Sequence, residues 1–139
     1  MAAIWAASSM GHWNASAHGD RVVSTDGDAI TVVDADTVNI GADRYRLVGF
    51  DSPEIYHVGC RRERDIGLIA ASRLIEIMRS GNVVVQRLPG RDKWRRGLAR
   101  ITVDGRDIGD TLIAEGHARP YNRRGKRSGW CGPATRGGS

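Results

Sequence analysis

Short hydrophobic runs separated by turn residues dominate the chain from residue 29 onward. Runs rich in Val, Ile and Thr are typical of strands, and Gly and Asp between them mark turns. The pattern predicts strands over residues 29–33, 37–40, 44–50, 83–88 and 98–103. Gly41-Ala42-Asp43 is the predicted turn of an early hairpin. Asp104-Gly105 is a strong hairpin signal that leads to a short return strand at residues 106–108.

A segment whose apolar residues recur at helical spacing lies between the third and fourth predicted strands. Apolar residues spaced three or four apart form one face of a helix, and here they are Ile66, Ile69, Ala70, Leu74, Ile77 and Met78. This helix is expected to end at Ser80-Gly81, and a second, short helix is predicted over residues 108–115. The order of elements predicts an α+β fold that is mainly β, namely a five-stranded, antiparallel Greek-key barrel of the OB type with two helices.

The chain has 139 residues, which is room for one domain with one core. We place this OB-fold domain at residues 20–131. Residues 1–19 are expected to be a disordered N-terminal segment or the remnant of a signal peptide, and residues 132–139 a flexible tail. After Tyr121 the chain is Gly-rich and basic without periodicity, which favours an irregular conformation. A monomer is the default for one small domain.

The beginning of the chain bears on its location. Ala15-Ser16-Ala17 is similar to a signal-peptidase site, although no basic region precedes it. We therefore expect an exported protein, periplasmic or secreted. A run of roughly eighteen apolar residues is needed to span a bilayer, and the sequence contains no such run. No membrane span is expected.

Charge is unevenly distributed along the chain. The net charge of +5 favours polyanionic partners such as nucleic acid, an anionic membrane or an acidic protein. Residues 1–54 carry eight acids and three bases, whereas residues 86–139 carry five acids and thirteen bases. This segregation suits a metal site that faces a phosphate-binding surface, and it suits two solvated faces equally well. The motifs have to decide between them.

The two cysteines, Cys60 and Cys131, lie 71 residues apart. In an oxidising compartment a bridge between them would close a large loop and stabilise the fold by about 4 kcal/mol. Two cysteines without a histidine at zinc-finger spacing argue against a zinc site.

Acidic residues surround the end of the third predicted strand. Asp34-Ala35-Asp36-Thr37 lies at a strand turn, and the segment from Arg46 to Glu54, RLVGFDSPE, begins ten residues after Asp36. Carboxylates from separate strands supply the oxygen ligands that Ca²⁺ prefers. Phosphodiester hydrolysis also needs a group that activates water and cations that stabilise developing charge, and Glu54 and Arg46 are candidates. Either motif alone is more often a simple turn, but their combination favours a site.

A basic turn, Asp92-Lys93-Trp94-Arg95-Arg96-Gly97, leads into the last long strand. Arginine grips phosphate through two donors, lysine acts as a point charge, and tryptophan offers a face on which a base can stack. This combination favours nucleotide binding, although an exposed basic hairpin with Trp94 over the core would have the same sequence.

Taken together, these motifs resemble the staphylococcal nuclease (thermonuclease) family. DADTV, RLVGFDSPE, DKWRRGLA and, after a short helix, GHARPY follow the family's signatures in order over about residues 29–121. The resemblance implies a calcium-dependent phosphodiesterase on an OB fold, an endonuclease that hydrolyses DNA and RNA with little sugar specificity.

The resemblance also implies a role for individual residues. Transferred to this sequence, the expected site consists of the calcium ligands Asp36, Asp51 and, through its carbonyl, Ser52; the phosphate-binding arginines Arg46 and Arg96; the water-activating carboxylate Glu54; and the nucleotide contacts Lys93, Trp94 and Tyr121. Asp34 is expected to support the ligands from behind them.

Four positions depart from the family's pattern. Ala35 and Arg95 stand where the family has glycine, Ser52 where it has threonine, and Trp94 where it has tyrosine. A positive φ at Ala35 or Arg95 would cost on the order of 1 kcal/mol and tilt the adjacent site residue. The upstream Asp26-Gly27-Asp28 is also similar to the first motif, but it lies too far before the second one, and we predict a surface turn there.

The main alternative is a non-catalytic OB-fold protein that binds nucleic acid. Such a protein needs only the arginines and Trp94. It leaves Asp36, Asp51 and Glu54 unexplained, because carboxylates repel a phosphate backbone unless a cation lies between them. The sequence therefore favours the enzyme.

Overall fold

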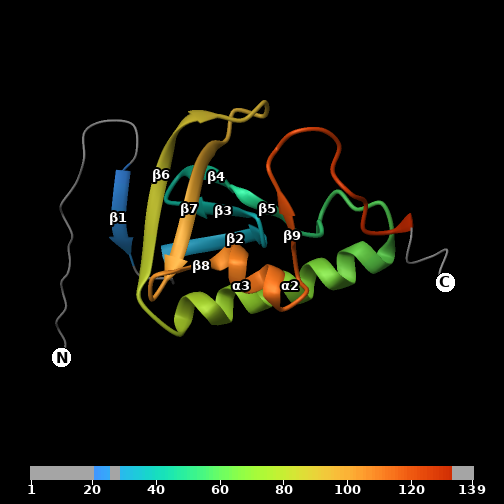
Figure 1. Cartoon of the computed structure of the whole chain (residues 1–139), viewed down its shortest axis with the longest axis horizontal. Helices are drawn as coiled ribbons and strands as arrows, with labels where there is room; N and C mark the ends of the chain where they lie inside the picture. Colours follow the sequence, from blue (N-terminus) through green and yellow to red (C-terminus); the bar gives the residue numbers. More distant parts are fainter. Residues whose placement is uncertain (1–20, 26–28, 133–139) are drawn as a thin grey trace.

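The computed structural model describes residues 21–25 and 29–132 (Figure 1). The predicted N-terminal segment 1–19, the predicted turn at 26–28 and all but the first residue of the predicted tail lie outside the described residues. In chain order the elements are β1 (Arg21–Thr25), β2 (Ile30–Asp34), β3 (Thr37–Ile40), β4 (Asp43–Leu47), β5 (Gly49–Asp51), α2 (Arg61–Arg79), β6 (Val83–Arg91), β7 (Gly97–Val103), β8 (Arg106–Asp107), α3 (Ile108–Ala114) and β9 (Arg119–Tyr121).

The strands form one large sheet and one small one. The large sheet has the order β1-β6-β7-β4-β3-β2, with β8 paired to β7, and β5 pairs with β9 separately. The predicted fold class, α+β and mainly β, is confirmed, with two helices among the described residues. The details differ from the prediction, because the described residues form nine strands, β4 and β7 pair in parallel, and the hydrogen-bonded sheet is not closed.

Two local features explain the larger number of strands. The predicted strand 44–50 bends at Gly49, which has a φ of 100° that glycine adopts readily and other residues do not. The bend divides the strand into β4 and β5. At the bend the Val48 amide donates to the carbonyl of Ala99. The chain before residue 29 adds β1, which pairs with β6, whereas β2 pairs with β3. The two ends of the sheet are thus consecutive strands, and no ladder among the described residues joins them.

Both helices begin at a side-chain cap and lie together on one side of the sheet (Figure 1). Cys60 Sγ accepts a hydrogen bond from the Glu63 amide at the start of α2, and Asp107 accepts from the Gly109 amide at the start of α3. The α2 helix ends at Ser80, as predicted, where the amide and the hydroxyl of Ser80 both donate to the carbonyl of Ile77.

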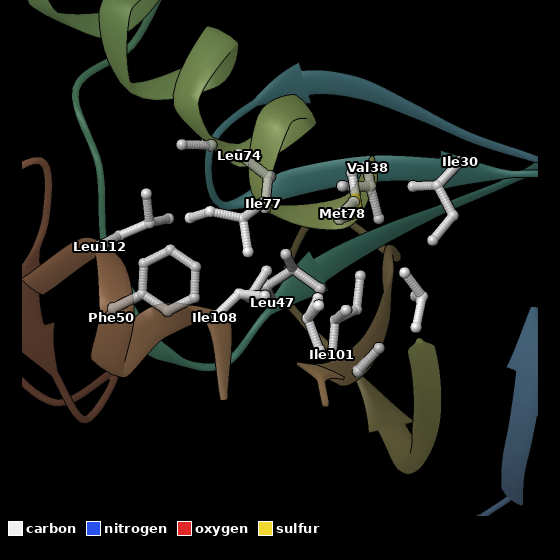
Figure 2. Packing of buried hydrophobic residues seen from close by; sticks show 14 of the residues in the cluster. Ile30, Val38, Leu47, Phe50, Leu74, Ile77, Met78, Ile101, Ile108 and Leu112 are labelled. Atoms are coloured by element: carbon white, nitrogen blue, oxygen red, sulfur yellow. The ribbon is translucent and has the colours of Figure 1, made fainter. Parts of the chain in front are cut away.

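The core lies between α2, α3 and the sheet (Figure 2). Four of the six residues predicted to form the apolar face of α2 are buried, whereas Ile66 is half-buried and Ile69 is exposed. Leu74 of α2 faces Val38, Leu47 and Phe50 from the strands, and Leu112 of α3 closes one end. Full burial of a side chain of this size contributes about 1.5–3 kcal/mol. This packing fixes α2 against the strands that carry the motifs.

Gly67 allows a close approach between α2 and the segment that follows β5. A Cβ atom at Gly67 would lie 2.6 Å from the carbonyl oxygen of Glu54 and 3.0 Å from that of Pro53. The helix therefore supports the backbone at Glu54 directly. Within the described ranges, no helix is long and apolar enough to cross a membrane.

Candidate active site

Asp36, Arg46 and Asp51 meet at one end of the large sheet. Asp36 lies in the β2–β3 turn, Arg46 lies on β4 opposite Thr37, and Asp51 ends β5. All three side chains are buried. The guanidinium of Arg46 bridges the two carboxylates, with Nη1 3.3 Å from Asp36 Oδ2 and Nη2 3.4 Å from Asp51 Oδ1. The structure thus brings together three of the predicted site residues.

Arg46 is fixed by backbone carbonyls as well as by carboxylates. Its Nη1 donates to the carbonyls of Leu47 at 2.9 Å, Phe50 at 3.2 Å and Asp36 at 3.3 Å. A buried guanidinium needs such partners for its donors. Arg46 is therefore a rigid, permanently charged part of the site.

Ser52 and Asp34 support the carboxylate of Asp36 and the segment beyond it. The Ser52 amide donates to Asp36 Oδ2 at 2.9 Å, while the Ile55 amide donates to Asp34 Oδ1 at 3.0 Å. Burial, together with the neighbouring charge of Asp36, raises the pKa of Asp34 to about 6. Burial also raises the pKa of Asp51, against the opposing effect of Arg127.

Glu54 lies at the rim of this cluster and is half-buried. Its amide donates to Oε2 of Glu63, a buried residue in the first turn of α2 whose Oε1 accepts from the Gly59 amide. Glu63 contacts the amide of Glu54, and Gly67 lies close to its carbonyl, so that α2 holds the backbone of Glu54 at both groups. The side chain of Glu54 is left to face the groove described next.

A groove of about 1170 Å³ runs over these residues. Its walls include side chains from both sequence motifs and from the C-terminal segment, among them Asp36, Arg46, Glu54, Trp94, Arg96 and Arg127. Two of the three predicted acids, Asp36 and Glu54, therefore face one space with the two predicted arginines. Asp51 and Ser52 do not line it, and reach it through their contacts with Arg46 and Asp36.

The predicted basic turn is held by Asp92. The carboxylate of Asp92 accepts from the amides of Trp94 at 2.9 Å and Arg96 at 2.8 Å, and pairs with Arg96 Nε at 2.6 Å. Burial alone would raise the pKa of Asp92, but the hydrogen bonds and charge of Arg96 hold this pKa below its ordinary value. Arg96 Nη1 also lies 3.4 Å from Thr37 Oγ1, beside Asp36. Asp92 thus positions Arg96 over the groove.

The exposed residues of this turn differ in their relation to the groove. Trp94 is 68% exposed and lines the groove, while Lys93 stands outside it with Nζ 5.3 Å from the centre of the Trp94 ring. Arg95 has a φ of 68°, the left-handed conformation that the family's glycine would adopt freely. Ala35 is fully buried and is not among the described residues with positive φ. Of the two substitutions of glycine, only Arg95 strains the backbone.

Tyr121 lies apart from the other predicted site residues. It ends β9 and lines a separate depression of about 620 Å³ with Gly49, Arg100 and Arg123. Its hydroxyl lies 3.4 Å from the carbonyl of Gly125. The structure therefore does not bring Tyr121 to the groove that holds Asp36 and Arg96.

Two residues that contact the carboxylates were not predicted from the sequence. Arg127 Nε lies 3.0 Å from Asp51 Oδ1, and Trp130 Nε1 donates to Asp51 Oδ2 at 3.2 Å. Both residues belong to the irregular basic segment, which is attached to the start of α2 by a disulfide between Cys60 and Cys131. The pair of cysteines was the signal in the sequence that this segment returns to the site.

A family model of staphylococcal nuclease homologues matches residues 44–129. The chain belongs to the staphylococcal nuclease family. The matched range contains Arg46, Asp51, Glu54 and Arg96, whereas Asp36 precedes it. Membership in this family indicates a nuclease or nucleic-acid-binding function. No curated protein matches the chain.

The oxygen donors at this site suit a hard cation of the kind on which staphylococcal nucleases depend. The carboxylates of Asp36 and Asp51 and the carbonyl of Ser52 are the ligand types that Ca²⁺ takes, with water completing its shell. Ser52 Oγ is buried without a hydrogen-bond partner, so the polar surroundings of Asp36 are not fully satisfied by the protein. Across the described ranges, no three side chains of His, Cys, Asp or Glu form a metal-binding group. Any cation bound here therefore depends on two carboxylates, backbone oxygen and water.

Proposed function

We propose that the protein is a calcium-dependent endonuclease that hydrolyses phosphodiester bonds in DNA and RNA with little sugar specificity. One observation carries this proposal: Arg46, which lines the groove together with Glu54 and Arg96, bridges the carboxylates of Asp36 and Asp51. A site that binds nucleic acid without cutting it has no use for carboxylates at the phosphate position.

Different residues at the groove have different roles in the proposed hydrolysis. Asp36, Asp51 and the Ser52 carbonyl would hold Ca²⁺, which would supply charge stabilisation to a phosphate oxygen when bound. Arg46 and Arg96 approach the groove from β4 and from the turn before β7, and their guanidinium groups neutralise charge that develops on the equatorial oxygens. Glu54 accepts a proton from, or orients, the attacking water.

Trp94 and Lys93 extend the site along a strand of nucleic acid. The exposed indole of Trp94 offers a stacking surface for a base, worth about 1–3 kcal/mol, without selecting the sugar or the sequence. Lys93 adds a cation beside it. These contacts suit a single strand whose bases are accessible.

We also infer that the protein is exported and acts in an oxidising compartment. The disulfide between Cys60 and Cys131 supports this inference, because such bonds persist outside the reducing cytosol. Edman sequencing of the protein recovered from the culture medium or periplasm tests it, and recovery from the cytosol alone would contradict it.

The second candidate function is binding of nucleic acid without cleavage. It is favoured by the protein donors that already occupy the carboxylates of Asp36 and Asp51, since these leave less room for a metal ligand shell. It predicts binding that weakens with salt and no cutting with or without calcium.

Cleavage of single-stranded DNA in Ca²⁺ and in EDTA tests the proposal. We expect cutting that requires Ca²⁺ and falls by about 10²–10⁴-fold in Glu54→Gln. Glu76→Gln is the matched control, because Glu76 lies on α2 with its side chain 68% exposed and loses the same charge. Salt-sensitive binding without any cutting would establish the second candidate instead.

A further inference from the structure

Residues 122–132, which we call the strap, cross from β9 to the start of α2 (Figure 1). The Cys60–Cys131 disulfide fixes the far end of the strap. Close to that end, Arg119 Nη1 donates to the Gly129 carbonyl at 2.8 Å, and the Arg119 guanidinium stacks 3.7 Å from the centre of the Trp130 ring. The strap is irregular in conformation but tied at several points.

The strap places a cation on the carboxylates of the proposed active site. Arg127 pairs with Asp51 Oδ1 at 3.0 Å through Nε and with Glu54 Oε2 at 3.4 Å through Nη2. Trp130 Nε1 occupies the other oxygen of Asp51. The proposed metal ligand and the proposed water-activating group are thus joined by one guanidinium.

The side chain of Arg127 is held beside the carboxylates less firmly than that of Arg46. Arg46 is buried and bonded to three backbone carbonyls, so it stays in place whatever binds beside it. The side chain of Arg127 is 38% exposed, and the ion pairs it makes are with carboxylates. A divalent cation at Asp51 would repel Arg127 and compete for the same oxygen atoms.

We propose that Arg127 is an internal counter-ion that competes with the divalent metal ion for Asp51 while it also occupies Glu54, and that it must move away when metal binds. This inference rests on the proposed calcium-dependent function. In the metal-free protein Arg127 compensates the charge of a buried carboxylate, which stabilises the fold. The same contact lowers the affinity of the site for metal, because Arg127 and the metal ion cannot occupy the carboxylate of Asp51 together.

Two measurements on Arg127→Gln test this competition, and neither is nuclease activity. Calorimetric titration with CaCl₂ should show binding tightened by roughly fivefold or more. Urea unfolding of the metal-free protein should show a lower free energy of unfolding, since buried Asp51 loses one of its charged partners. These opposite effects distinguish a competing cation from a residue that merely anchors the strap, whose loss would weaken both.

Arg124→Gln is the matched control, because Arg124 is an exposed arginine of the same strap and its loss changes the net charge equally. Its Ca²⁺ affinity should stay close to that of the wild type. Equal tightening in both variants would reduce the effect to general charge and overturn the proposal, as would unchanged or weaker binding in Arg127→Gln. Failure of the wild type and every variant to bind Ca²⁺ would overturn the calcium-dependent function as well. A Ca²⁺ affinity that is the same in the wild type and in Arg127→Gln would overturn this inference alone.

Discussion

Arg95 holds a backbone conformation that favours glycine, directly before a proposed phosphate-binding arginine. Its φ of 68° costs a side chain about 1 kcal/mol relative to glycine. Arg95→Gly should therefore raise the free energy of unfolding by about this amount in urea denaturation. Arg95→Ala, which removes the charge but keeps Cβ, is the control and should not stabilise. Equal stabilisation by both variants would assign the effect to charge instead of backbone strain.

Asp92 should make stability depend on pH in the acid range. Its folded pKa lies below the unfolded value of about 3.9 because Arg96 pairs with it, so its contribution is present above pH 3.9 and is lost as the pH falls through the lower, folded pKa. In urea denaturation, the wild type should lose more stability between about pH 5 and pH 2 than Asp92→Asn. Asp65→Asn, an exposed change on α2, should follow the wild type. Parallel profiles for wild type and Asp92→Asn would contradict the assignment.

At the scale of residues, the sequence predicted which side chains lie together where a motif contained its own partners. Asp36 directly precedes the hairpin of β3 and β4 that carries Arg46, so short-range pairing brings these two together, and Asp51 follows five residues after Arg46. Arg127 and Trp130 were not predicted, because their irregular segment has no periodic hydrophobic pattern from which the direction of a side chain could be inferred. Tyr121 was placed by resemblance, and its strand carries it to a separate depression.

The packing of α2 against the segment after β5 offers a test at the scale of elements. Gly67→Ala adds a Cβ only 2.6 Å from the Glu54 carbonyl oxygen, and backbone atoms there cannot yield easily. The gain in helix propensity, about 1 kcal/mol, should be outweighed by the clash, with a net loss of about 1 kcal/mol in unfolding free energy. We also expect cleavage to fall by more than the loss of folded protein explains, because Glu54 is displaced.

The control for Gly67→Ala is Ser72→Ala, an exposed position of the same helix. This change should be neutral or slightly stabilising, by about 0.5 kcal/mol, and leave cleavage unchanged. A Gly67→Ala protein that is both more stable and fully active would show that α2 does not restrain Glu54.

Elements with a clear period or turn chemistry were predicted well, and those shaped by distant contacts were not. The predicted end of α2 at Ser80 is correct, but the helix begins at Arg61, five residues before the apolar stripe, because Cys60 caps it. The bend at Gly49 and the pairing of β5 with β9 depend on contacts across the chain that no local pattern contains. The strand β1 was missed, although its Val-Val and Thr are typical of strands.

At the scale of the whole molecule, the disulfide joins two segments 71 residues apart. Replacing both Cys60 and Cys131 by Ser should lower the free energy of unfolding by about 4 kcal/mol, because the unfolded chain regains the freedom of a large loop. Serine at position 60 keeps an acceptor for the helix cap. Guanidinium denaturation with and without dithiothreitol measures the effect. Reductant should destabilise the wild type and leave the double variant unchanged, and an equal response in both would exclude the bridge.

The parallel pairing of β4 with β7 determines when, during folding, the groove can form. Tyr45 lies opposite Gly97, and these residues are separated in the chain by α2 and all of β6. Closing so long a loop costs entropy before the stabilising contacts have formed, so such pairings form slowly. A nascent chain that has reached only β6 carries Asp36, Arg46 and Glu54 but not Arg96. The growing polypeptide therefore lacks one of the two proposed phosphate-binding arginines of the groove until β7 has been synthesised and has docked.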